Sequence, residues 1–423
     1  MELTRRSLLA ALGAGTAAAL TGCGAGTDAG GKADGPAEGE ITLLTPIYEG
    51  ADGKQLLEGK ILKEFRKKHP DVKVNVDYTN YTQLNEKITT ALAGGLLPDV
   101  LMMGVGWIPP FAAKKVLAEL PESLAAKYDY EERVLEPSRY QGKLYALPTV
   151  MATRLVAYRK DHFAAAGIKK PPASLHELRA MAKELTKGDR MGIDPFSIDL
   201  RQCWETFLYA NGATLFNADG TKTAFTGARG VESLQFFKDL QKDGSADYTK
   251  KTDGDAGATT NLQLGKASMM MTGSGLWKQL QEQSPDLIEK DLIGAFVLRG
   301  RKPAMLTGGT LVCQSARTQH AAAAQALVAH LAAPDNVLAA AAQRETVPGI
   351  TSLRSSSYVK SNKLVDFSVR NLKDACAEGG TPAWMEIREK IKPTLEPAVV
   401  SGKSAAAAIA ELGELADAAI SRL

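Results

Sequence analysis

The chain of 423 residues has few of the side chains that carry metal chemistry or a disulfide framework, with only four cysteines and five histidines. There is no Cys-x-x-Cys motif, and the histidines never recur at metal-ligand spacing. We therefore expect no metal, no cofactor and a fold stabilised by core burial. Apart from Cys23, three cysteines remain, Cys203, Cys313 and Cys376, and this odd number leaves at least one thiol without a partner in the chain.

The sequence also lacks an excess of charge of one sign, since 51 Lys and Arg stand against 48 Asp and Glu, a formal net charge of +3. Nucleic acid is therefore not an expected partner. After residue 22 no segment is apolar over the ~20 residues that a membrane-spanning helix needs.

The first 22 residues predict an export signal. Arg5-Arg6 precedes an Ala- and Leu-rich run that ends at Leu20, and Leu20-Thr21-Gly22-Cys23 is typical of a lipobox. We expect lipidation of Cys23, which would anchor the chain to the outer face of the cytoplasmic membrane. The paired arginines indicate twin-arginine export, with the general secretory route left open. The Gly-, Ala-, Asp- and Pro-rich segment 23–40 is predicted to be a flexible tether.

From Ile41 onward, short apolar strands alternate with amphipathic helices, which predicts an α/β fold with helices flanking the sheets. The remaining length of nearly 400 residues exceeds one ordinary core, so two lobes are expected. We predict strands and helices as follows: strands over 41–44, 72–76, 99–103 and 155–158, and helices over 175–185, 321–331 and, at the end of the chain, 405–416.

The four tryptophans each stand near a turn or a helix start, beside Gly, Pro or a polar residue. A flat indole can pack on the C–H face of a sugar ring while neighbouring polar groups bond its hydroxyls. The alternative is that these indoles fill the core at lobe junctions. The residues are Trp107, Trp204, Trp277 and Trp384.

Two short motifs carry little information. Gly402-Lys403-Ser404 lacks the first glycine of a phosphate loop, so Ser404 is predicted to cap a helix instead. Ser357-Tyr358-Val359-Lys360 fits Ser-x-x-Lys, but no companion motif of that enzyme class is present.

Several segments together resemble the extracellular solute-binding proteins that include maltose-binding protein, over nearly the whole chain after the tether. They are FRKKHPDV at 65–72, GLLPDV at 95–100, GKLYALP at 142–148, NADGTK at 217–222, GKASMM at 265–270, TGG at 307–309 and SGKS at 401–404. The resemblance implies two α/β lobes with parallel or mixed sheets, joined by crossing segments that act as a hinge. Lobe 1 would comprise 41–148 plus 304–345, and lobe 2 would comprise 149–303 plus 346–423.

The resemblance also implies where a solute would be held, in the cleft between the lobes. With Trp384 added from the indole pattern, the implied ligand-binding residues are Tyr48, Glu49, Trp107, Met151, Thr153, Trp204, Glu205, Trp277, Gly308, Gly309, Thr310 and Trp384. Three positions depart from the pattern of sugar-binding members. Gly106 and Ala152 stand where acidic residues are common, and Thr310 stands where an aromatic residue is common.

The resulting hypothesis is a monomeric, exported lipoprotein that captures a carbohydrate without altering it and delivers it to the permease of an ABC importer. One alternative keeps the fold but changes the solute to a polyamine, a phosphate ester or a metal chelate. Another is a secreted glycan-acting enzyme that uses Glu49 and Glu205 as paired carboxylates. The charge of the pocket distinguishes between these classes of solute, because arginines and lysines favour a phosphate whereas carboxylates favour an amine.

Overall fold

The structure is a computed structural model that describes residues 35–252 and 257–423. The predicted signal segment and Cys23 lie outside the described residues. The first strand, β1 (Gly39–Thr45), includes the last two residues of the predicted tether, because Gly39 and Glu40 pair in register with Val72 and Lys73. Among the described helices, none has the length and apolar content that a bilayer crossing requires.

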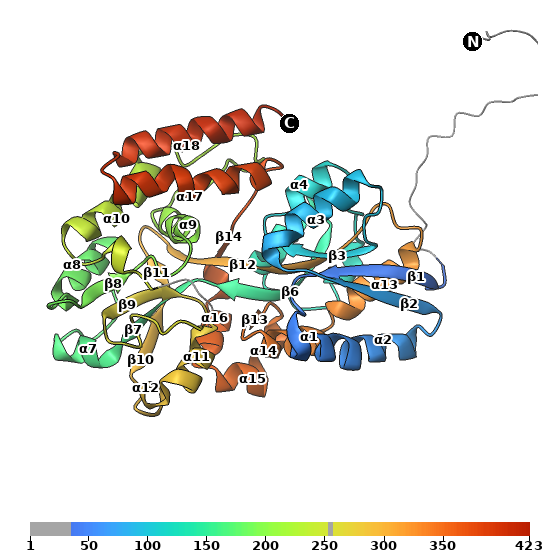
Figure 1. Ribbon diagram of the computed structural model, residues 1–423, viewed down its shortest axis with the longest axis horizontal. Coiled ribbons are helices and arrows are strands. Elements are labelled where there is room, and N and C mark those ends of the chain that lie inside the picture. Colours follow the sequence, from blue (N-terminus) through green and yellow to red (C-terminus); the bar gives the residue numbers. More distant parts are fainter. Residues whose placement is uncertain (1–34, 253–256) are drawn as a thin grey trace, which may run out of the picture.

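Lobe 1 is built on a mixed sheet, in the order β13-β6-β12-β3-β1-β2 (Figure 1). β1 pairs in parallel with β2 and β3, whereas β12 runs antiparallel to β3 and β6. The further strands are β2 (Val72–Tyr78), β3 (Val100–Gly104), β6 (Ala146–Thr153), β12 (Pro303–Gln314) and β13 (Val347–Pro348), with β11 (Leu298–Arg299) and β14 (Ala375–Ala377) paired to β12. The mixed sheet agrees with the predicted fold class.

Lobe 2 has a smaller sheet, in the order β10-β7-β9-β8. A separate two-stranded sheet belongs to the segment between β3 and β6. The strands are β7 (Leu155–Arg159), β8 (Met191–Asp194), β9 (Ala267–Thr272), β10 (Ile293–Phe296) and, in the separate sheet, β4 (Arg139–Tyr140) and β5 (Lys143–Leu144).

Helices surround both sheets, and α17 and α18 pack together at the top of lobe 2 (Figure 1). Those of lobe 1 are α1 (Gly50–Leu56), α2 (Leu62–Lys68), α3 (Tyr81–Ala93), α4 (Ile108–Ala113), α5 (Glu122–Ala125), α6 (Glu132–Leu135), α13 (Ala321–Leu331) and α14 (Pro334–Gln343). Those of lobe 2 are α7 (Lys160–Ala165), α8 (Leu175–Leu185), α9 (Leu200–Ala210), α10 (Ala228–Lys242), α11 (Leu276–Gln283), α12 (Pro285–Glu289), α17 (Trp384–Val400) and α18 (Ala405–Ile420). Between the lobes lie α15 (Ser357–Ser361) and α16 (Lys363–Arg370).

Local sequence signals placed several helix ends correctly. The helices predicted over 175–185 and 321–331 coincide with α8 and α13. Ser404 caps α18, since its side chain accepts a hydrogen bond from the Ala407 N–H. These predictions are confirmed. They could be made from the sequence because caps and apolar periodicity involve residues that are close together in the chain.

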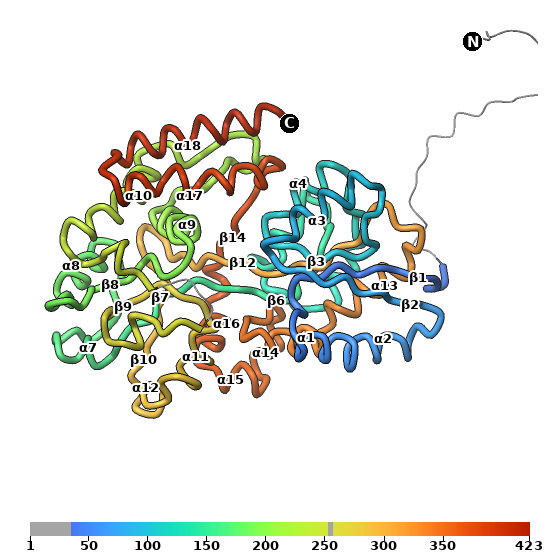
Figure 2. The backbone as a smooth tube through the Cα atoms, in the orientation of Figure 1, coloured from blue at the N-terminus to red at the C-terminus, as the bar shows by residue number. Residues whose placement is uncertain are grey.

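The chain passes between the lobes inside strands. β6 of lobe 1 is followed directly by β7 of lobe 2, with Arg154 between them (Figure 2). Along β12, Ala304 and Leu306 pack in the core of lobe 2, whereas Leu311 and Cys313 pack in the core of lobe 1. The two crossing strands, β6 and β12, therefore connect the two lobes. We call the middle of these two strands the floor.

All three cysteines after Cys23 are free thiols in the described residues. Cys203 and Cys313 are buried and Cys376 is partly buried. Burial raises the pKa of each thiol above its ordinary value, which disfavours the thiolate. The prediction of at least one unpaired thiol is confirmed.

Candidate functional site

Solvent reaches the backbone at the middle of the two crossing strands. In β12 the residues on either side of Gly308 and Gly309 are buried, whereas these two glycines are partly exposed. In β6 only Ala152 is partly exposed, and it pairs with Gly308. A Cβ atom placed on Gly308 would meet nothing within 4 Å. This open floor between the lobes is the candidate site.

In the first crossing strand, the residues that face the floor are each one position away from the predicted residues Met151 and Thr153. Met151 is fully buried in the core of lobe 1, and the Thr153 hydroxyl is 2.8 Å from the Ser368 hydroxyl of α16. Successive side chains of a strand point to opposite faces, so Ala152 and Arg154 face the floor instead. The side chains of Met151 and Thr153 are buried in this structure, and their contact with solute stays a prediction.

Arg154 brings a guanidinium group to the edge of this floor. Its Nε donates to Gln202 Oε1 at 2.9 Å, and its Nη1 lies 3.3 Å from the position that a Cβ on Gly273 would take. Gly273 precedes α11 of lobe 2 and Gln202 lies on α9. Arg154 thus lies beside two segments of lobe 2, at Gln202 and at Gly273.

Three charged side chains meet deeper in lobe 2. Arg201 Nη1 donates to Glu205 Oε1 at 3.2 Å and also to Glu378, which follows β14. The side chains of Arg201, Glu205 and Glu378 are 8%, 0% and 9% exposed. Burial raises the pKa of Glu205 to about 8, although the nearby Arg201 opposes the rise. Glu205 is enclosed and its side chain is bonded to Arg201, and solute contact by Glu205 stays a prediction.

Tyr81, at the start of α3 in lobe 1, lies beside the floor. Its ring is 40% exposed, while its hydroxyl donates to the Gly309 carbonyl at 3.3 Å and is bonded to the Thr310 hydroxyl. Burial of that hydroxyl raises the pKa of Tyr81 to about 12, and the nearby guanidinium groups of Arg344 and Arg388 oppose the rise. Tyr81 is therefore an aromatic residue anchored to β12, and its hydroxyl is influenced by the charges of Arg344, Arg388 and Glu378.

These two cations come from different lobes. Arg344 follows α14 of lobe 1 and donates to the Ile47 carbonyl at 2.9 Å. Arg388 lies on α17 of lobe 2, with its guanidinium carbon 5.6 Å from the ring centre of Trp107 in lobe 1. We call Tyr81, Arg154, Arg201, Glu205, Arg344, Glu378 and Arg388 the interlobe cluster.

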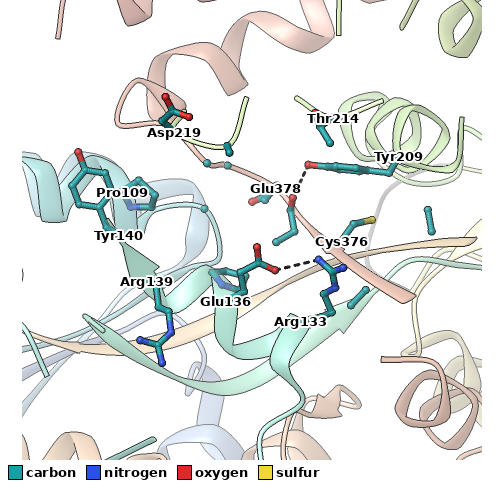
Figure 3. A pocket seen from close by; sticks show the side chains of 18 of the residues that line it. Pro109, Arg133, Glu136, Arg139, Tyr140, Tyr209, Thr214, Asp219, Cys376 and Glu378 are labelled. Carbon is teal, nitrogen blue, oxygen red and sulfur yellow. Dashed lines mark hydrogen bonds and ion pairs between the residues drawn. The ribbon is translucent and has the colours of Figure 1, made fainter. Parts of the chain in front are cut away.

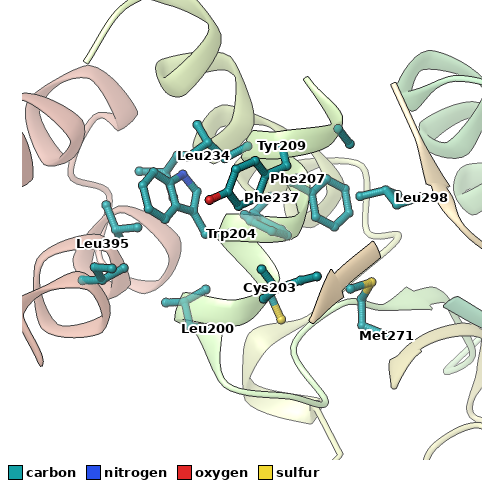
Figure 4. Close-up of a cluster of buried hydrophobic side chains, with 14 of the residues drawn as sticks. Leu200, Cys203, Trp204, Phe207, Tyr209, Leu234, Phe237, Met271, Leu298 and Leu395 are labelled. Carbon is teal, nitrogen blue, oxygen red and sulfur yellow. The ribbon is translucent and has the colours of Figure 1, made fainter. Parts of the chain in front are cut away.

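All four indoles are buried, and Trp204 and Trp384 are both 0% exposed. Trp204 lies within the core of lobe 2 (Figure 4). It meets Phe225 edge to face, with 5.4 Å between the ring centres. The burial arises because α9 directs this indole inward, and solute contact by Trp204 stays a prediction. Trp277 packs in a second core cluster of lobe 2 and is 3% exposed.

Trp107 and Trp384 lie where the lobes meet. Trp107 stacks on Phe111 at 6.4 Å, and Arg388 approaches the same indole from the other lobe. A Cβ on Gly106 would lie 2.8 Å from Trp384 Nε1. This contact explains the absence of an acidic residue at position 106, since a side chain there would collide with Trp384. Solute contact by Trp107, Trp277 and Trp384 stays a prediction.

The remaining predicted residues divide between the core and the surface. Tyr48 is 1% exposed and packs in the core of lobe 1, whereas Glu49 is exposed at the start of α1. Gly308 and Gly309 form the floor, and Thr310 holds Tyr81 there. Gly309 has a φ of +133°, and a Cβ at this position would lie 2.3 Å from the Val150 carbonyl oxygen.

A separate interlobe cavity of about 900 Å³ contains none of the twelve predicted residues (Figure 3). Lobe 1 contributes Arg133, Glu136 and Arg139, and the side of lobe 2 contributes Tyr209 and Glu378. Glu378 thus belongs both to the cavity lining and to the interlobe cluster. In residues 35–252 and 257–423, no group of three or more His, Cys, Asp or Glu side chains is arranged to hold a metal ion.

Most of the interlobe cluster was missed in the sequence. Tyr81, Arg201, Arg344, Glu378 and Arg388 stand in no motif and are distant from one another in the chain. Arg154 could have been found, because strand alternation after Ala152 places it on the same face. The rest depended on how the lobes meet.

Comparisons with known proteins agree with this architecture. Residues 60–366 match the family model described as bacterial extracellular solute-binding protein. The sugar-binding protein MalE of Xanthomonas citri superimposes with a TM-score of 0.78 at 23% identity, covering 91% of this chain and 98% of that one. The cyclic alpha-maltosyl-1,6-maltose binding protein of Arthrobacter globiformis gives 0.76 at 20% identity, with 92% and 100% covered. At these identities the superpositions show the fold alone.

Two curated relatives are also similar in sequence. The diacetylchitobiose binding protein DasA of Streptomyces coelicolor is 31% identical over 226 residues, 52% of each chain. A putative binding protein of Brucella abortus is 27% identical over 255 residues, 59% of this chain, and the chain spans 61% of that relative's length. With the family model matched over most of its residues and the fold shared, this chain belongs to the bacterial extracellular solute-binding protein family.

Proposed function

We propose that the protein is an exported lipoprotein, attached through Cys23, that binds a carbohydrate between its lobes and delivers it to the permease of an ABC importer. Family membership supports solute binding, and the names of the relatives support a carbohydrate, since they describe binding of diacetylchitobiose and of maltose-related sugars. The protein acts as a monomer, and it releases the solute unaltered.

The open floor at Ala152, Gly308 and Gly309 is the observation that carries this proposal. Exposed backbone amides and carbonyls offer hydrogen-bond partners to hydroxyl groups, and the anchored ring of Tyr81 offers an apolar face beside them. Side chains from both lobes surround the floor. A solute that bonds to both would favour the closed arrangement by its differential affinity, and the permease would recognise that arrangement.

The structure disfavours two of the alternatives. A polyamine requires a pocket rich in free carboxylates, whereas Glu205 and Glu378 are already bonded to Arg201. A glycan-acting enzyme requires two carboxylates that flank one bond. Glu205 is enclosed in lobe 2 and Glu49 is exposed at the start of α1 in lobe 1, so neither is placed for that chemistry.

The test is a thermal-shift screen of the mature protein against mono- and oligosaccharides, amino acids and polyamines. A carbohydrate present at 100 times its Kd should stabilise the fold by about 2.7 kcal/mol. Small-angle scattering with that carbohydrate should show compaction, and chromatography should recover it unaltered. Stabilisation by polyamines or amino acids alone, or recovery of a product, would overturn the proposal.

A further inference from the structure

The helical segment 57–68 of lobe 1 has an outer side that is rich in positive charge. It consists of a π-helical turn, Leu57–Ile61, followed by α2. Four apolar side chains hold its inner side in a core cluster of lobe 1 and are 0% exposed, namely Leu57, Ile61, Leu62 and Phe65. The basic residues are all exposed, and we call them the basic face: Lys60, Lys63, Arg66, Lys67 and Lys68.

Neighbouring carboxylates do not neutralise the basic face. Among the residues that the structure describes, none of its members has a carboxylate within 4.0 Å. The closest acidic residue before it in the chain is Glu58, whose carboxylate accepts a hydrogen bond from the Tyr78 hydroxyl at 2.6 Å. Between residues 60 and 68 the sequence has one acidic residue, Glu64. The face therefore keeps a net positive charge that is open to an anionic partner.

The basic face ends beside the point where the chain enters lobe 1 (Figure 1). The N–H of Gly39, the first residue of β1, donates to the Asp71 carbonyl at 2.9 Å, and Asp71 follows Lys68 by three residues. Gly39 in turn follows Cys23 by 16 residues, a length of chain that spans at most about 55 Å. A lipid on Cys23 would therefore keep the end of α2 within reach of the membrane surface.

The chemistry of the basic face matches a membrane that contains anionic lipids. The phosphates of such a membrane attract lysines and arginines that lie within a Debye length of its surface, about 8 to 10 Å. Charges spread along a rigid helix match a surface that presents many phosphates at once, whereas a single free phosphate contacts only one or two of them. A lipid anchor and a basic patch together hold a protein to a membrane more firmly than either does alone.

We propose that the basic face docks on anionic phospholipid headgroups of the membrane to which Cys23 is anchored, and that this contact orients lobe 1 on that surface. The inference rests on the lipid anchor of the proposed function, and it adds a second contact with the same membrane. The carbohydrate site between the lobes takes no part in it.

The experiment measures co-sedimentation of the mature chain, from Cys23 onward and produced without its lipid, with vesicles at low salt. Vesicles of phosphatidylglycerol and phosphatidylcholine in equal parts are compared with vesicles of phosphatidylcholine alone. One variant combines Lys60→Gln, Lys63→Gln and Lys67→Gln, and a second combines Lys60→Arg, Lys63→Arg and Lys67→Arg. The matched control makes the same change of charge at exposed lysines of lobe 2: Lys169→Gln, Lys170→Gln and Lys222→Gln. Melting temperatures verify that each variant folds.

We expect the unchanged chain to bind the vesicles that contain phosphatidylglycerol and not those of phosphatidylcholine alone, with added salt weakening the binding. The Gln variant of the basic face should bind at least about tenfold more weakly, while the Arg variant and the lobe 2 control should bind like the unchanged chain.

Three results would overturn the inference: no binding to the anionic vesicles, equal binding by the Gln variant and the lobe 2 control, or tighter binding to soluble polyphosphate than to the vesicles. None of them bears on carbohydrate binding, which the thermal-shift screen tests. The anchor itself is tested separately, by measuring the mass of the Cys23 peptide from cells.

Discussion

Two regions lie between the lobes, and they differ in what their charged groups are bonded to. The large cavity of Figure 3 has about 900 Å³ of space, and two of the arginines that line it are paired with carboxylates. Arg133 lies 3.4 Å from Glu136, and Arg139 is bonded to Glu122. In the interlobe cluster, by contrast, Arg154 and Arg344 have no carboxylate within 4.0 Å in the described residues, and Arg388 pairs only with the exposed Glu389.

The difference shows that volume alone is a poor guide to a binding site. Binding energy comes from polar groups that a ligand completes, and groups already paired inside the protein gain little from a new partner. The cluster has such groups and an exposed aromatic ring, whereas the cavity has space. If this is correct, substitutions of similar size should affect solute affinity very differently in the two regions.

The largest effect is expected from Gly308→Val. Nothing lies within 4 Å of the added Cβ, and the strand conformation suits a β-branched residue, so the protein should fold. The valine methyl groups would fill the floor and reduce carbohydrate affinity about a hundredfold, as measured by calorimetry.

The matched control lies in the cavity. Arg139→Gln removes a side chain that lines the cavity and breaks its bond to Glu122, which is exposed. A surface ion pair contributes little, so affinity and melting temperature should both stay near the wild-type values. A large loss of affinity in Arg139→Gln, with Gly308→Val binding normally, would reverse the assignment of the two regions.

An intermediate effect is expected from Tyr81→Ala. This change removes the exposed ring and should weaken carbohydrate binding about tenfold in a titration. Tyr81→Phe keeps the ring but loses the bonds to Gly309 and Thr310, so its loss should be smaller. Equal losses in the two variants would mean that the hydroxyl matters and the ring does not.

The last expected effect is on stability and not on affinity, and it involves Glu205. Its pKa is raised to about 8 by burial, from an ordinary value of 4.5, so the folded protein holds a proton that the unfolded chain has released. Stability should then be complete below the unfolded pKa and fall as pH rises toward about 8. Glu205→Gln should remove this dependence in denaturant unfolding. A wild-type protein equally stable from pH 5 to pH 8, relative to the variant, would contradict it.

Much of the fold followed from local patterns in the sequence. The helices over 175–185 and 321–331, the strands beginning near residues 41 and 72, and the cap at Ser404 were all predicted. Apolar periodicity and capping act over a few residues, so a sequence reveals them directly. The site was predicted less well. Of the predicted residues, Gly308 and Gly309 of β12 are the ones that lie at the centre of the candidate site.

The sequence by itself determined the fold class, the family resemblance and the odd number of thiols. Only the tertiary structure decided that Trp204 fills a core, that Ala152 and Arg154 rather than Met151 and Thr153 face the floor, and that Tyr81 meets Gly309. The physical reason is distance along the chain: 228 residues separate Tyr81 from Gly309. Contacts of that kind depend on how two lobes pack, and no local pattern encodes them.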